Sequence, residues 1–278
     1  MSAIDAIAIE KYKEHRLKAG AAPATVNREL EALRRAFTLA VQHGLLPSRP
    51  HVERLREDNV RKGFFEPEQF EALLKHLNEV ESGKARPVAA VVTFAYVTGW
   101  RLGEILGLRW RNVDFKAGTV RLEPGTTKNK EGRTFPMNAE LRRLLDERRE
   151  AQKLQTRRTK VVALKDAGEG RVFTRKNGRP IGTFGKRWHS AVRAIGVPDR
   201  VVKKRLPSGK VVERRLPGLL VHDFRRTAVR RLERAGVARS VAMKLVGHKT
   251  ESIYRRYAIV SESDLREAVE KLGAVTGA

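Results

Sequence analysis

The stretch "VGHKTESIYRRYAIV" (residues 246–260) carries two phenols, Tyr254 and Tyr257, three positions apart. A phenol has an ordinary pKa of about 10, so at neutral pH it attacks an electrophile only when neighbouring groups help it. Arginine, lysine and histidine would favour the phenolate, and their hydrogen bonds would stabilise the added charge of a pentacoordinate phosphorus. The stretch alone leaves open whether a tyrosine is a nucleophile or both are core aromatics.

Arg101 is a candidate source of such help. It lies in "TGWRLGEILGL", directly after an apolar segment that we expect to be buried, and Glu104 follows three residues later on the same side of the expected helix. A guanidinium near the end of a buried element needs a partner, and an oxyanion is the usual one. The alternative is that Arg101 pairs only with Glu104, as a buried salt bridge.

The stretch "VHDFRRTAVRRL" supplies two more candidates. His222 and Arg225 stand at i and i+3, so both project from one face of a helix. Each positive charge disfavours the other, and a bound phosphate would resolve that conflict. The alternative is that His222 caps the helix and Arg225 is exposed.

A lysine in the loop "TTKNKEG" is the fourth candidate. A loop lysine is usually solvated surface, but its long stem can carry the ammonium into a neighbouring cleft, where it could donate a proton to a leaving oxygen. Spacing does not choose between Lys128 and Lys130.

The elements that must position these residues are mostly helices. Apolar periodicity predicts helices within 24–41, after Pro67, and over 183–195, 219–235 and 240–246. Residues 87–97 are apolar nearly all round, which predicts a buried helix. The period changes in "GTVRLEP" and "RTFPM", which predict two short strands joined by the loop that carries Lys128. We therefore expect a predominantly α (α+β) fold with a small antiparallel sheet.

Other local signals set the ends of elements. Asn138 can cap a long charged helix, and Ser261 with Asp264 forms a capping box for a last helix. Residues 201–216, "VVKKRLPSGKVVERRL", predict a twisted basic hairpin, with a disordered charged loop as the alternative. Prolines and charges interrupt the helical pattern near residue 50. We expect a helical domain at 1–45, a linker at 46–62 and a larger domain at 63–278.

Composition narrows the partners. The 278 residues include 58 Lys plus Arg against 32 Asp plus Glu, a formal charge of +26, so a polyanion is the natural partner and nucleic acid is the leading candidate. A solvated basic surface is the alternative. There is no cysteine, and the seven histidines show no metal-binding spacing, so we expect no disulfide, metal or other cofactor. Without a signal-peptide core or a bilayer-spanning run, we expect a soluble, cytoplasmic protein.

Four separated signals occur in one order: Arg with Glu three later, a hairpin Lys, His-x-x-Arg, and Gly-His followed by Tyr. That order resembles the tyrosine recombinase (phage integrase) family. The resemblance runs over about residues 63–272, through "TGWRLGEILGL", "TKNKEGRTFPM", "HDFRRTAV" and "LVGHKTESIYRRYA". Each stretch is weak by itself, whereas the four together at compatible separations are specific.

The resemblance implies a role for each candidate. Arg101, Arg225 and His248 would bind the scissile phosphate, with Glu104 orienting Arg101. Lys128 would protonate the departing 5′ oxygen. His222 would act as general base. The family's nucleophile usually lies nine positions after the histidine of Gly-His, which implies Tyr257; Tyr254 would then be a packing residue or a DNA contact, at a position where the family commonly has a small polar residue.

The N-terminal segment resembles the family's helical core-binding domain, particularly "YKEHRLKAGAAPATVNRELEALRRAF". Such domains form, with the catalytic domain, a clamp around double-stranded DNA. Only about fifty residues precede the linker, fewer than the family usually has, so the domain is expected to be truncated. The basic hairpin at 201–216 stands where many relatives have a short connection, and we expect it to be an added DNA contact.

The activity that the resemblance implies is site-specific DNA recombination or integration. One strand would be cleaved through a 3′-phosphotyrosyl intermediate without any cofactor, and strands would be exchanged through a Holliday junction. The protein would be a monomer when free and a homo-tetramer on DNA. Two alternatives remain: a type IB topoisomerase-like enzyme that relaxes DNA, and a DNA-binding protein with a decayed site.

Overall fold

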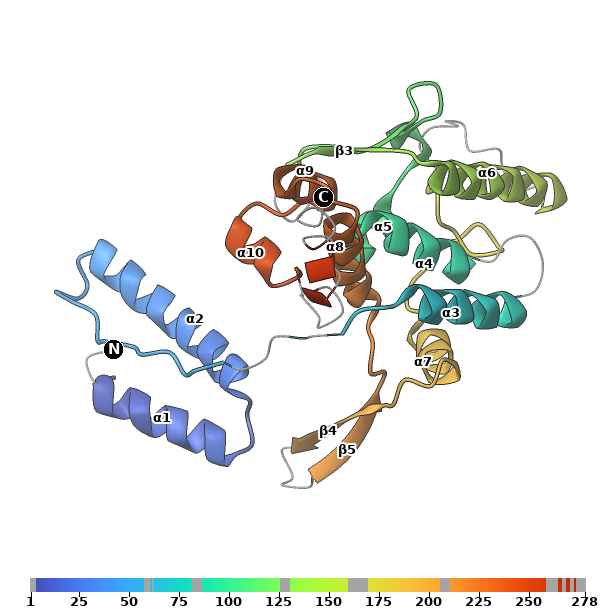
Figure 1. Cartoon of the computed structure of the whole chain (residues 1–278). Helices are drawn as coiled ribbons and strands as arrows, with labels where there is room; N and C mark the ends of the chain where they lie inside the picture. Colours follow the sequence, from blue (N-terminus) through green and yellow to red (C-terminus); the bar gives the residue numbers. More distant parts are fainter. Residues whose placement is uncertain are drawn as a thin grey trace. The chain divides into compact units, whose positions relative to one another are not determined.

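The computed structural model describes residues 4–57, 61, 63–81, 87–125, 131–159, 170–205, 211–258, 265–266, 269–270 and 273. The chain divides into two compact units, residues 1–61 with 201–215 and residues 62–200 with 216–278. Helices make up most of the described chain, and the strands form two small sheets (Figure 1). The predicted fold class, predominantly α with a small antiparallel sheet, is confirmed.

The first unit contains the helices α1 (Ala6–Lys18) and α2 (Pro23–Gln42). Arg28 and Arg35 of α2 are exposed, while the other side of this helix packs on α1. Three fully buried side chains join the two helices: Ile9, Val26 and Leu30. This arrangement confirms the helix that the apolar period predicts within 24–41.

The segment after α2 is bound to the same unit. The Asn27 Nδ2 donates to the Leu55 carbonyl (2.8 Å), and the Asn27 Oδ1 accepts from the Leu55 N–H (2.8 Å). Val52 and Leu55 also pack against the apolar core of the unit. Part of the predicted linker at 46–62 is therefore attached to α2, and residues 58–60 and 62 lie outside the described residues. The domain boundaries themselves stay a prediction.

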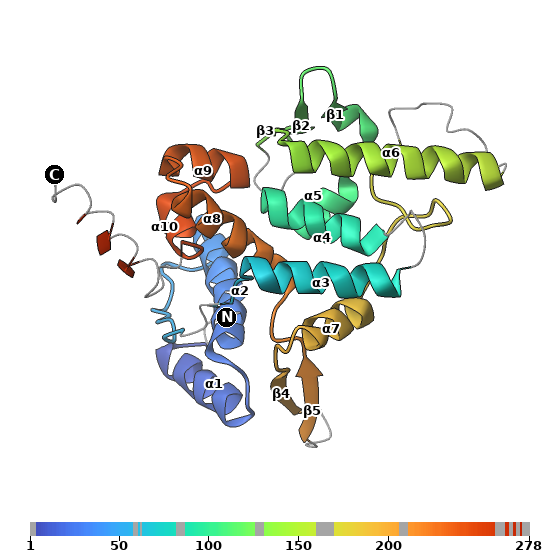
Figure 2. The ribbon, with the colours of Figure 1, turned by 45° about the vertical axis from the view of Figure 1, so that its right-hand side comes forward.

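Helix α4 lies at the centre of the second unit, between α3 and α6 (Figures 1 and 2). Ten of its 12 residues are buried, which confirms the buried helix predicted over 87–97. The helices of this unit are α3 (Pro67–Val80), α4 (Pro87–Thr98), α5 (Leu102–Gly107), α6 (Ala139–Thr159), α7 (Gly185–Ala194), α8 (Phe224–Arg234), α9 (Arg239–Val246) and α10 (Glu251–Arg255), with 3₁₀ turns η1 (Trp110–Asn112) and η2 (Val221–Asp223).

An aromatic cluster fixes the beginning of α8. The ring of Phe224, the first residue of this helix, stacks on Phe65 at 4.4 Å and meets Phe70, Tyr96 and Trp188 edge-on at 5.7 to 6.1 Å. Phe224 is 1% exposed. Removing a ring buried in this way typically costs about 3–5 kcal/mol, so the direction in which α8 starts is strongly determined.

A three-stranded antiparallel sheet lies beside these helices, in the order β1 (Val113–Asp114), β2 (Thr119–Leu122), β3 (Arg133–Pro136). Its register pairs Val120 with Phe135 and Leu122 with Arg133. The two strands predicted in "GTVRLEP" and "RTFPM" are confirmed, whereas β1 was not predicted because two residues carry no period. The Asn138 Oδ1 accepts from the Leu141 N–H (2.9 Å), so the predicted cap of α6 is confirmed.

The predicted basic hairpin is also present. β4 (Arg200–Arg205) and β5 (Val211–Leu216) form a two-stranded sheet of their own. Its valines are exposed, by 37 to 55%, at Val201, Val202, Val211 and Val212. Residues 206–210 lie outside the described residues, as do Ser261 and Asp264, the predicted cap of a last helix. The hairpin's contact with DNA stays a prediction.

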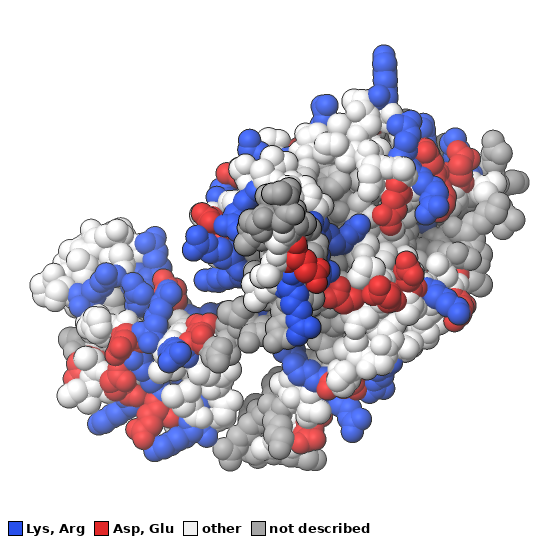
Figure 3. All heavy atoms as spheres, in the orientation of Figure 1, with Lys and Arg blue, Asp and Glu red and all other residues white. Residues whose placement is uncertain are grey.

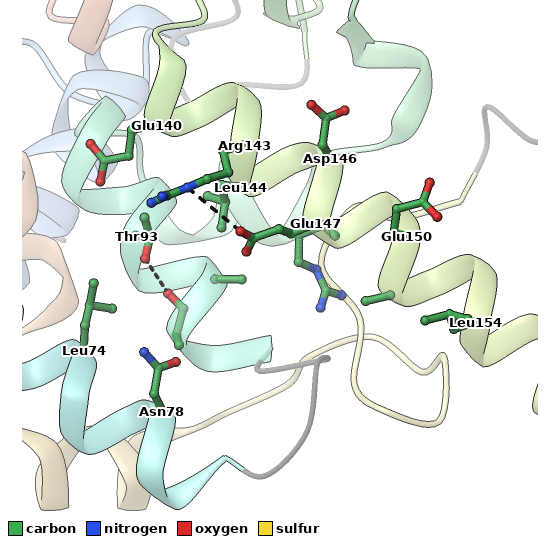
Figure 4. A pocket seen from close by; sticks show the side chains of 14 residues that line it. Leu74, Asn78, Thr93, Glu140, Arg143, Leu144, Asp146, Glu147, Glu150 and Leu154 are labelled. Atoms are coloured by element: carbon green, nitrogen blue, oxygen red, sulfur yellow. Dashed lines mark hydrogen bonds and ion pairs between the residues drawn. The ribbon is translucent and has the colours of Figure 1, made fainter.

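Lysine and arginine side chains are spread over the face shown in Figure 3, and acidic side chains gather in smaller groups. A groove of about 1040 Å³ lies between α3, α4 and α6 (Figure 4). Apolar side chains such as Leu74 and Leu144 line it together with acidic residues of α6, and none of the five predicted catalytic residues that the structure describes does. Among the described residues, no helix is long and apolar enough to span a membrane.

Candidate active site

Arg225 is the most constrained residue of the predicted site. Although charged, it is 1% exposed, and its guanidinium donates three hydrogen bonds: from Nε to the Nε2 of His248 (2.8 Å), from Nη1 to the Gly99 carbonyl (2.9 Å) and from Nη2 to the Gly247 carbonyl (3.0 Å). Gly99 has a φ of +64°, and a Cβ there would lie 2.7 Å from that of Ala228, so only glycine lets its carbonyl approach α8. The alternative in which Arg225 is exposed is wrong.

His248 is held neutral by these surroundings. It is 6% exposed, and burial, followed by the charges of Arg225 and Arg101, lowers its pKa to about 3. Because a guanidinium can only donate, the Nε2 of His248 accepts and the proton of the neutral ring lies on Nδ1. That buried Nδ1 has no acceptor among the described residues. Among the residues that the structure describes, the site therefore contains a buried donor that lacks a partner.

Tyr257 lies beside the other histidine. Its Oη is 3.0 Å from the Nε2 of His222. Loss of solvent, followed by the charges of Arg225 and Arg226, lowers the pKa of His222, so this imidazole is neutral at pH 7 and able to accept a proton. The ring of His248 lies 4.6 Å from the phenol ring, and the guanidinium carbons of Arg225 and Arg226 lie 5.7 and 5.2 Å from its centre. Base and cations thus surround one phenol.

Tyr254 has a different environment. It is 0% exposed and belongs to a small apolar core with Ala228, Ala242 and Val246. Burial, followed by the charge of Glu233, raises its pKa above the ordinary value. A substrate cannot reach this phenol without unpacking the core, so of the two expected roles of Tyr254 the structure supports packing.

Arg101 precedes the first turn of α5 and is bound to Glu104 in two ways. The Glu104 Oε2 accepts from the Arg101 backbone N–H (3.0 Å), and the Oε1 accepts from the Arg101 Nη1 (3.0 Å). The expected pair exists, but the side chain of Arg101 is 26% exposed while that of Glu104 is 5% exposed. No further acceptor for the Arg101 guanidinium occurs among the described residues, so most of its N–H groups remain available to a ligand.

Glu104 has a second partner, Arg133, the first residue of β3. The Nη2 of Arg133 donates to the Glu104 Oε2 in a short contact, and its guanidinium carbon lies 4.7 Å from the centre of the Trp100 ring. Burial alone would raise the pKa of Glu104, but the charge of Arg133 and the hydrogen bonds from Arg101 outweigh it and lower this pKa. Glu104 is therefore ionised and shared by two arginines.

The charges around Glu104 do not balance. Arg101, Arg133 and Arg225 are close enough for each other's fields to matter, and among the described residues Glu104 is the carboxylate that faces them. Burial, followed by Arg101 and Arg133, lowers the pKa of Arg225 to about 9, which still leaves it charged at pH 7. Partly buried cations in excess of anions are placed to bind an oxyanion.

Comparison with known proteins decides the family. The family model described as "Phage integrase family" matches residues 63–263. The chain belongs to this family. The resemblance to tyrosine recombinases is confirmed, and the chain is a tyrosine-type site-specific DNA recombinase. No group of three or more metal-binding side chains occurs among the described residues.

Several relatives share this family. The chain is 25% identical to a tyrosine recombinase XerC-like protein of Caldanaerobacter subterraneus subsp. tengcongensis, over 98% of the chain and 71% of that protein. It is 23% identical to the integrase of Salmonella phage P22, over 84% of the chain and 53% of the phage protein. The first of these alignments covers 98% of the chain, so it includes the N-terminal unit.

Solved structures show the same fold. The Tn1549 transposon integrase in complex with circular intermediate DNA superposes with a TM-score of 0.68 at 19% identity, over 96% of this chain and 85% of that one. A lambda integrase dimer bound to a COC′ core site gives a TM-score of 0.64 at 18% identity, over 92% and 65%.

Five of the six residues predicted for the recombinase site come together in the second unit: Arg101, His222, Arg225, His248 and Tyr257. They come from the residue before α5, from η2, from α8 and from the turns after α9 and α10, which are far apart in the sequence. Figure 2 shows α8, α9 and α10 next to one another. Lys128 lies outside the described residues, as does Lys130.

Sequence reasoning missed Arg133 in the recombinase site. Alternation along β3 is the signal that could have found it, because Arg133 and Phe135 share the inward face of the strand while Thr134 and Pro136 are exposed. An arginine at an inward position of a short strand needs an anionic partner. Glu104 was already predicted nearby, paired with Arg101.

Proposed function

We propose that this recombinase cleaves one DNA strand when the Oη of Tyr257 attacks a backbone phosphorus atom. A 3′-phosphotyrosyl bond forms, the bond from phosphorus to the 5′ oxygen breaks, and a 5′ hydroxyl is released. The observation that carries the proposal is the Tyr257 Oη at 3.0 Å from His222 Nε2, with the Arg225 guanidinium carbon 5.7 Å from the centre of the phenol ring. The fully buried Tyr254 lacks both features.

The proton balance assigns two further roles. His222, neutral because of its lowered pKa, accepts the proton of Tyr257 as the phenol attacks. Lys128 is proposed, from the family resemblance, to give a proton to the departing 5′ oxygen. Attack of another 5′ hydroxyl on the phosphotyrosyl bond reverses both transfers, so the bond energy is conserved and no ATP is consumed.

Phosphate binding is assigned to Arg101, Arg225 and His248. Arg101 supports this role by its unoccupied N–H groups, and Arg225 by a charge that cannot reach bulk water. The Nδ1–H of His248, buried without an acceptor among the described residues, would gain one from a phosphate oxygen. Fixed donors of this kind stabilise the pentacoordinate phosphorus, and each typically contributes about 100-fold or more to the rate.

The partner proposed for the whole chain is double-stranded DNA carrying a specific site. The N-terminal helical unit would serve as the core-binding domain of a clamp, with the second unit as the catalytic domain. Four copies would assemble on two sites and pass through a Holliday junction, and the free protein would be a monomer. The proposed location is the cytoplasm.

A covalent-capture selection tests the proposal and identifies the target sequence at the same time. The protein is incubated with nicked duplexes of random sequence. When a nick lies near the cleavage point, the short fragment that bears the new 5′ hydroxyl diffuses away, so the adduct cannot be religated. Denatured protein–DNA adducts are isolated and sequenced for the wild type, Tyr257→Phe and Tyr254→Phe. We expect the wild type and Tyr254→Phe to enrich one sequence and Tyr257→Phe to form no adduct.

Other outcomes would separate the alternatives. Adducts retained by Tyr257→Phe would overturn the nucleophile assignment. Adducts without sequence preference, together with relaxation of supercoiled plasmid, would favour a topoisomerase. DNA binding without any adduct would indicate a decayed site. Binding itself should weaken steeply with salt, by about 1000-fold between 50 and 200 mM if some six phosphates are contacted, and a flat response would contradict the electrostatic argument.

A further inference from the structure

Arg133 occupies a position that the reaction described so far does not use. It stands at the beginning of β3, where inward and outward residues alternate, and its side chain is 9% exposed. Phe135, on the same inward face, meets the Trp100 ring edge-on at 6.3 Å, and the Arg133 guanidinium lies over that ring at 4.7 Å. Burying this charge is costly, so its partners must compensate.

The main partner is the carboxylate that also binds Arg101. The Oε1 of Glu104 accepts from Arg101 (3.0 Å), and its Oε2 accepts both from the Arg101 backbone N–H (3.0 Å) and from the Arg133 side chain. One negative charge is therefore divided between two guanidinium groups. A carboxylate held by Arg133 on one side has a fixed orientation, and it fixes the Arg101 side chain bound to its other oxygen.

Arg133 also touches the turn that holds Arg225. Gly247 has a φ of +73°, and a Cβ built on it would overlap the Arg133 Nη1, so the guanidinium is packed directly against this glycine. The carbonyl of the same glycine accepts from the Arg225 Nη2 (3.0 Å). Arg133 thus contacts both Glu104, which binds Arg101, and Gly247, which binds Arg225. These two residues lie on different elements.

We propose that Arg133 is a positioning residue for oxyanion binding. It sets where Arg101, through Glu104, and Arg225, through the Gly247 turn, present their free N–H groups, and its own charge adds to the positive potential there. The inference rests on the proposed function, in which these groups receive the scissile phosphate. It goes further because it makes the phosphate affinity depend on a strand residue that does not touch the phosphate.

A purely structural role is the competing explanation. Arg133 would then only tie β3 to α5, and its loss would lower stability without changing how an anion is bound. Arg148 is a matched control, because it is an arginine of the same unit, is 4% exposed and contacts the Thr174 carbonyl (3.4 Å), away from the predicted site residues. A structural effect should appear equally in Arg148→Met and Arg133→Met.

The first measurement is anion binding, which does not depend on DNA cleavage. Sodium tungstate, a tetrahedral oxyanion, is titrated by calorimetry into full-length wild type, Arg133→Met, Arg133→Lys and Arg148→Met, each shown to be folded by thermal unfolding. We expect about a tenfold or greater loss of tungstate affinity in Arg133→Met, partial recovery in Arg133→Lys, which restores the charge, and no change in Arg148→Met. Equal tungstate affinity of the wild type and Arg133→Met would overturn the inference.

The second measurement uses the captured DNA site in two forms. A methylphosphonate at the scissile position lacks the charge of one nonbridging oxygen, so it needs less neutralisation by cations. If Arg133 acts on that charge, the cleavage defect of Arg133→Met should fall from about 100-fold on the phosphate to about tenfold or less on the methylphosphonate. An equal defect on both forms would count against the inference.

The two measurements keep the inference separate from the proposed function. Tungstate binding that depends on Arg133, in a protein that never forms an adduct with DNA, would uphold the inference and overturn the phosphotyrosyl mechanism. If the wild type forms the adduct but Arg133→Met binds tungstate as tightly as the wild type, the phosphotyrosyl mechanism would stand and the inference about Arg133 would be overturned.

Discussion

Two groups of arginines and glutamates in this protein differ in how they are balanced. On the first unit, Arg16 of α1 pairs with Glu29 of α2 at 2.7 Å, and their side chains are 32% and 31% exposed. On the second unit, Glu104 is 5% exposed and is shared by Arg101 and Arg133. The first group is a one-to-one pair in contact with water, whereas the second has more cations than anions and little water.

The physical consequence of burial separates the two groups. An exposed pair contributes about 0–1 kcal/mol, because water and salt screen both charges whether or not they meet. A buried group has no such alternative, so removing one partner leaves a charge that the protein must stabilise in another way. The exposed pair holds two helices together, and the buried group is poised to accept one more negative charge.

The largest effect is expected when a buried cation is removed from the site. Arg225→Gln should lower the rate of covalent adduct formation by about 1000-fold or more, because three anchored hydrogen bonds and a charge beside the phenol are lost together. Single-turnover cleavage of the captured duplex measures this. Arg16→Gln on the exposed pair should leave the rate within about twofold and stability nearly unchanged. Comparable losses in both variants would remove the distinction between the groups.

The next effect concerns the shared carboxylate. Glu104→Gln should reduce the free energy of unfolding by about 3 kcal/mol, because Arg101 and Arg133 would face each other without a counter-charge. Urea denaturation gives the value. Glu29→Gln is the matched control, expected to change it by less than about 1 kcal/mol. A Glu104→Gln protein as stable as the wild type would show that water already screens the buried group.

Much of this arrangement was predictable from sequence, for reasons that differ between residues. The apolar run of 87–97 predicted a buried helix and the period of "GTVRLEP" predicted a strand, because the side chains of one element follow the surroundings of that element. Arg225 was a candidate because it stands three positions after His222, and His248 because the motif around it could be compared with a family. Arg133 was not, because its partner Glu104 comes from another element, and a pairing between elements leaves no period in either sequence.

The two tyrosines teach the same lesson. Tyr254 and Tyr257 are three positions apart, so local pattern gives them nearly the same description. Packing distinguishes them: α10 ends at Arg255, which puts Tyr254 inside the helix and under the α8–α9 core, and Tyr257 in the following turn beside His222. The segment 52–57 shows the converse, because its charges and the prolines before it predicted a linker, whereas its bonds to Asn27 and the packing of Val52 and Leu55 attach it to α2.

A glycine substitution sharpens the comparison at the scale of about 2 kcal/mol. Gly247→Ala should destabilise the protein by this amount or more, because φ is +73° and the new Cβ would overlap the Arg133 Nη1. Gly236→Ala has a similar φ of +69° but nothing within 4 Å, so it should cost only the backbone strain, about 1 kcal/mol. Thermal or urea unfolding measures both. Equal losses of stability in the two variants would mean that the Arg133 side chain moves away from the new Cβ at little cost and is not packed tightly against the turn.

The smallest effect is the pH dependence that the buried cations impose on His248. In the unfolded chain this histidine takes up a proton below its ordinary pKa of about 6.5, whereas in the folded protein its pKa is about 3. The unfolded state therefore binds more protons between these values, and stability falls as the pH decreases from 6.5 toward 3, by up to about 1.4 kcal/mol per pH unit. Urea unfolding at pH 7, 6 and 5 should show this slope in the wild type. His248→Phe contains the same other titrating groups, so the difference between the two slopes isolates His248, and the slope of the variant should be shallower by that amount. Identical slopes would mean that the imidazole is protonated inside the site.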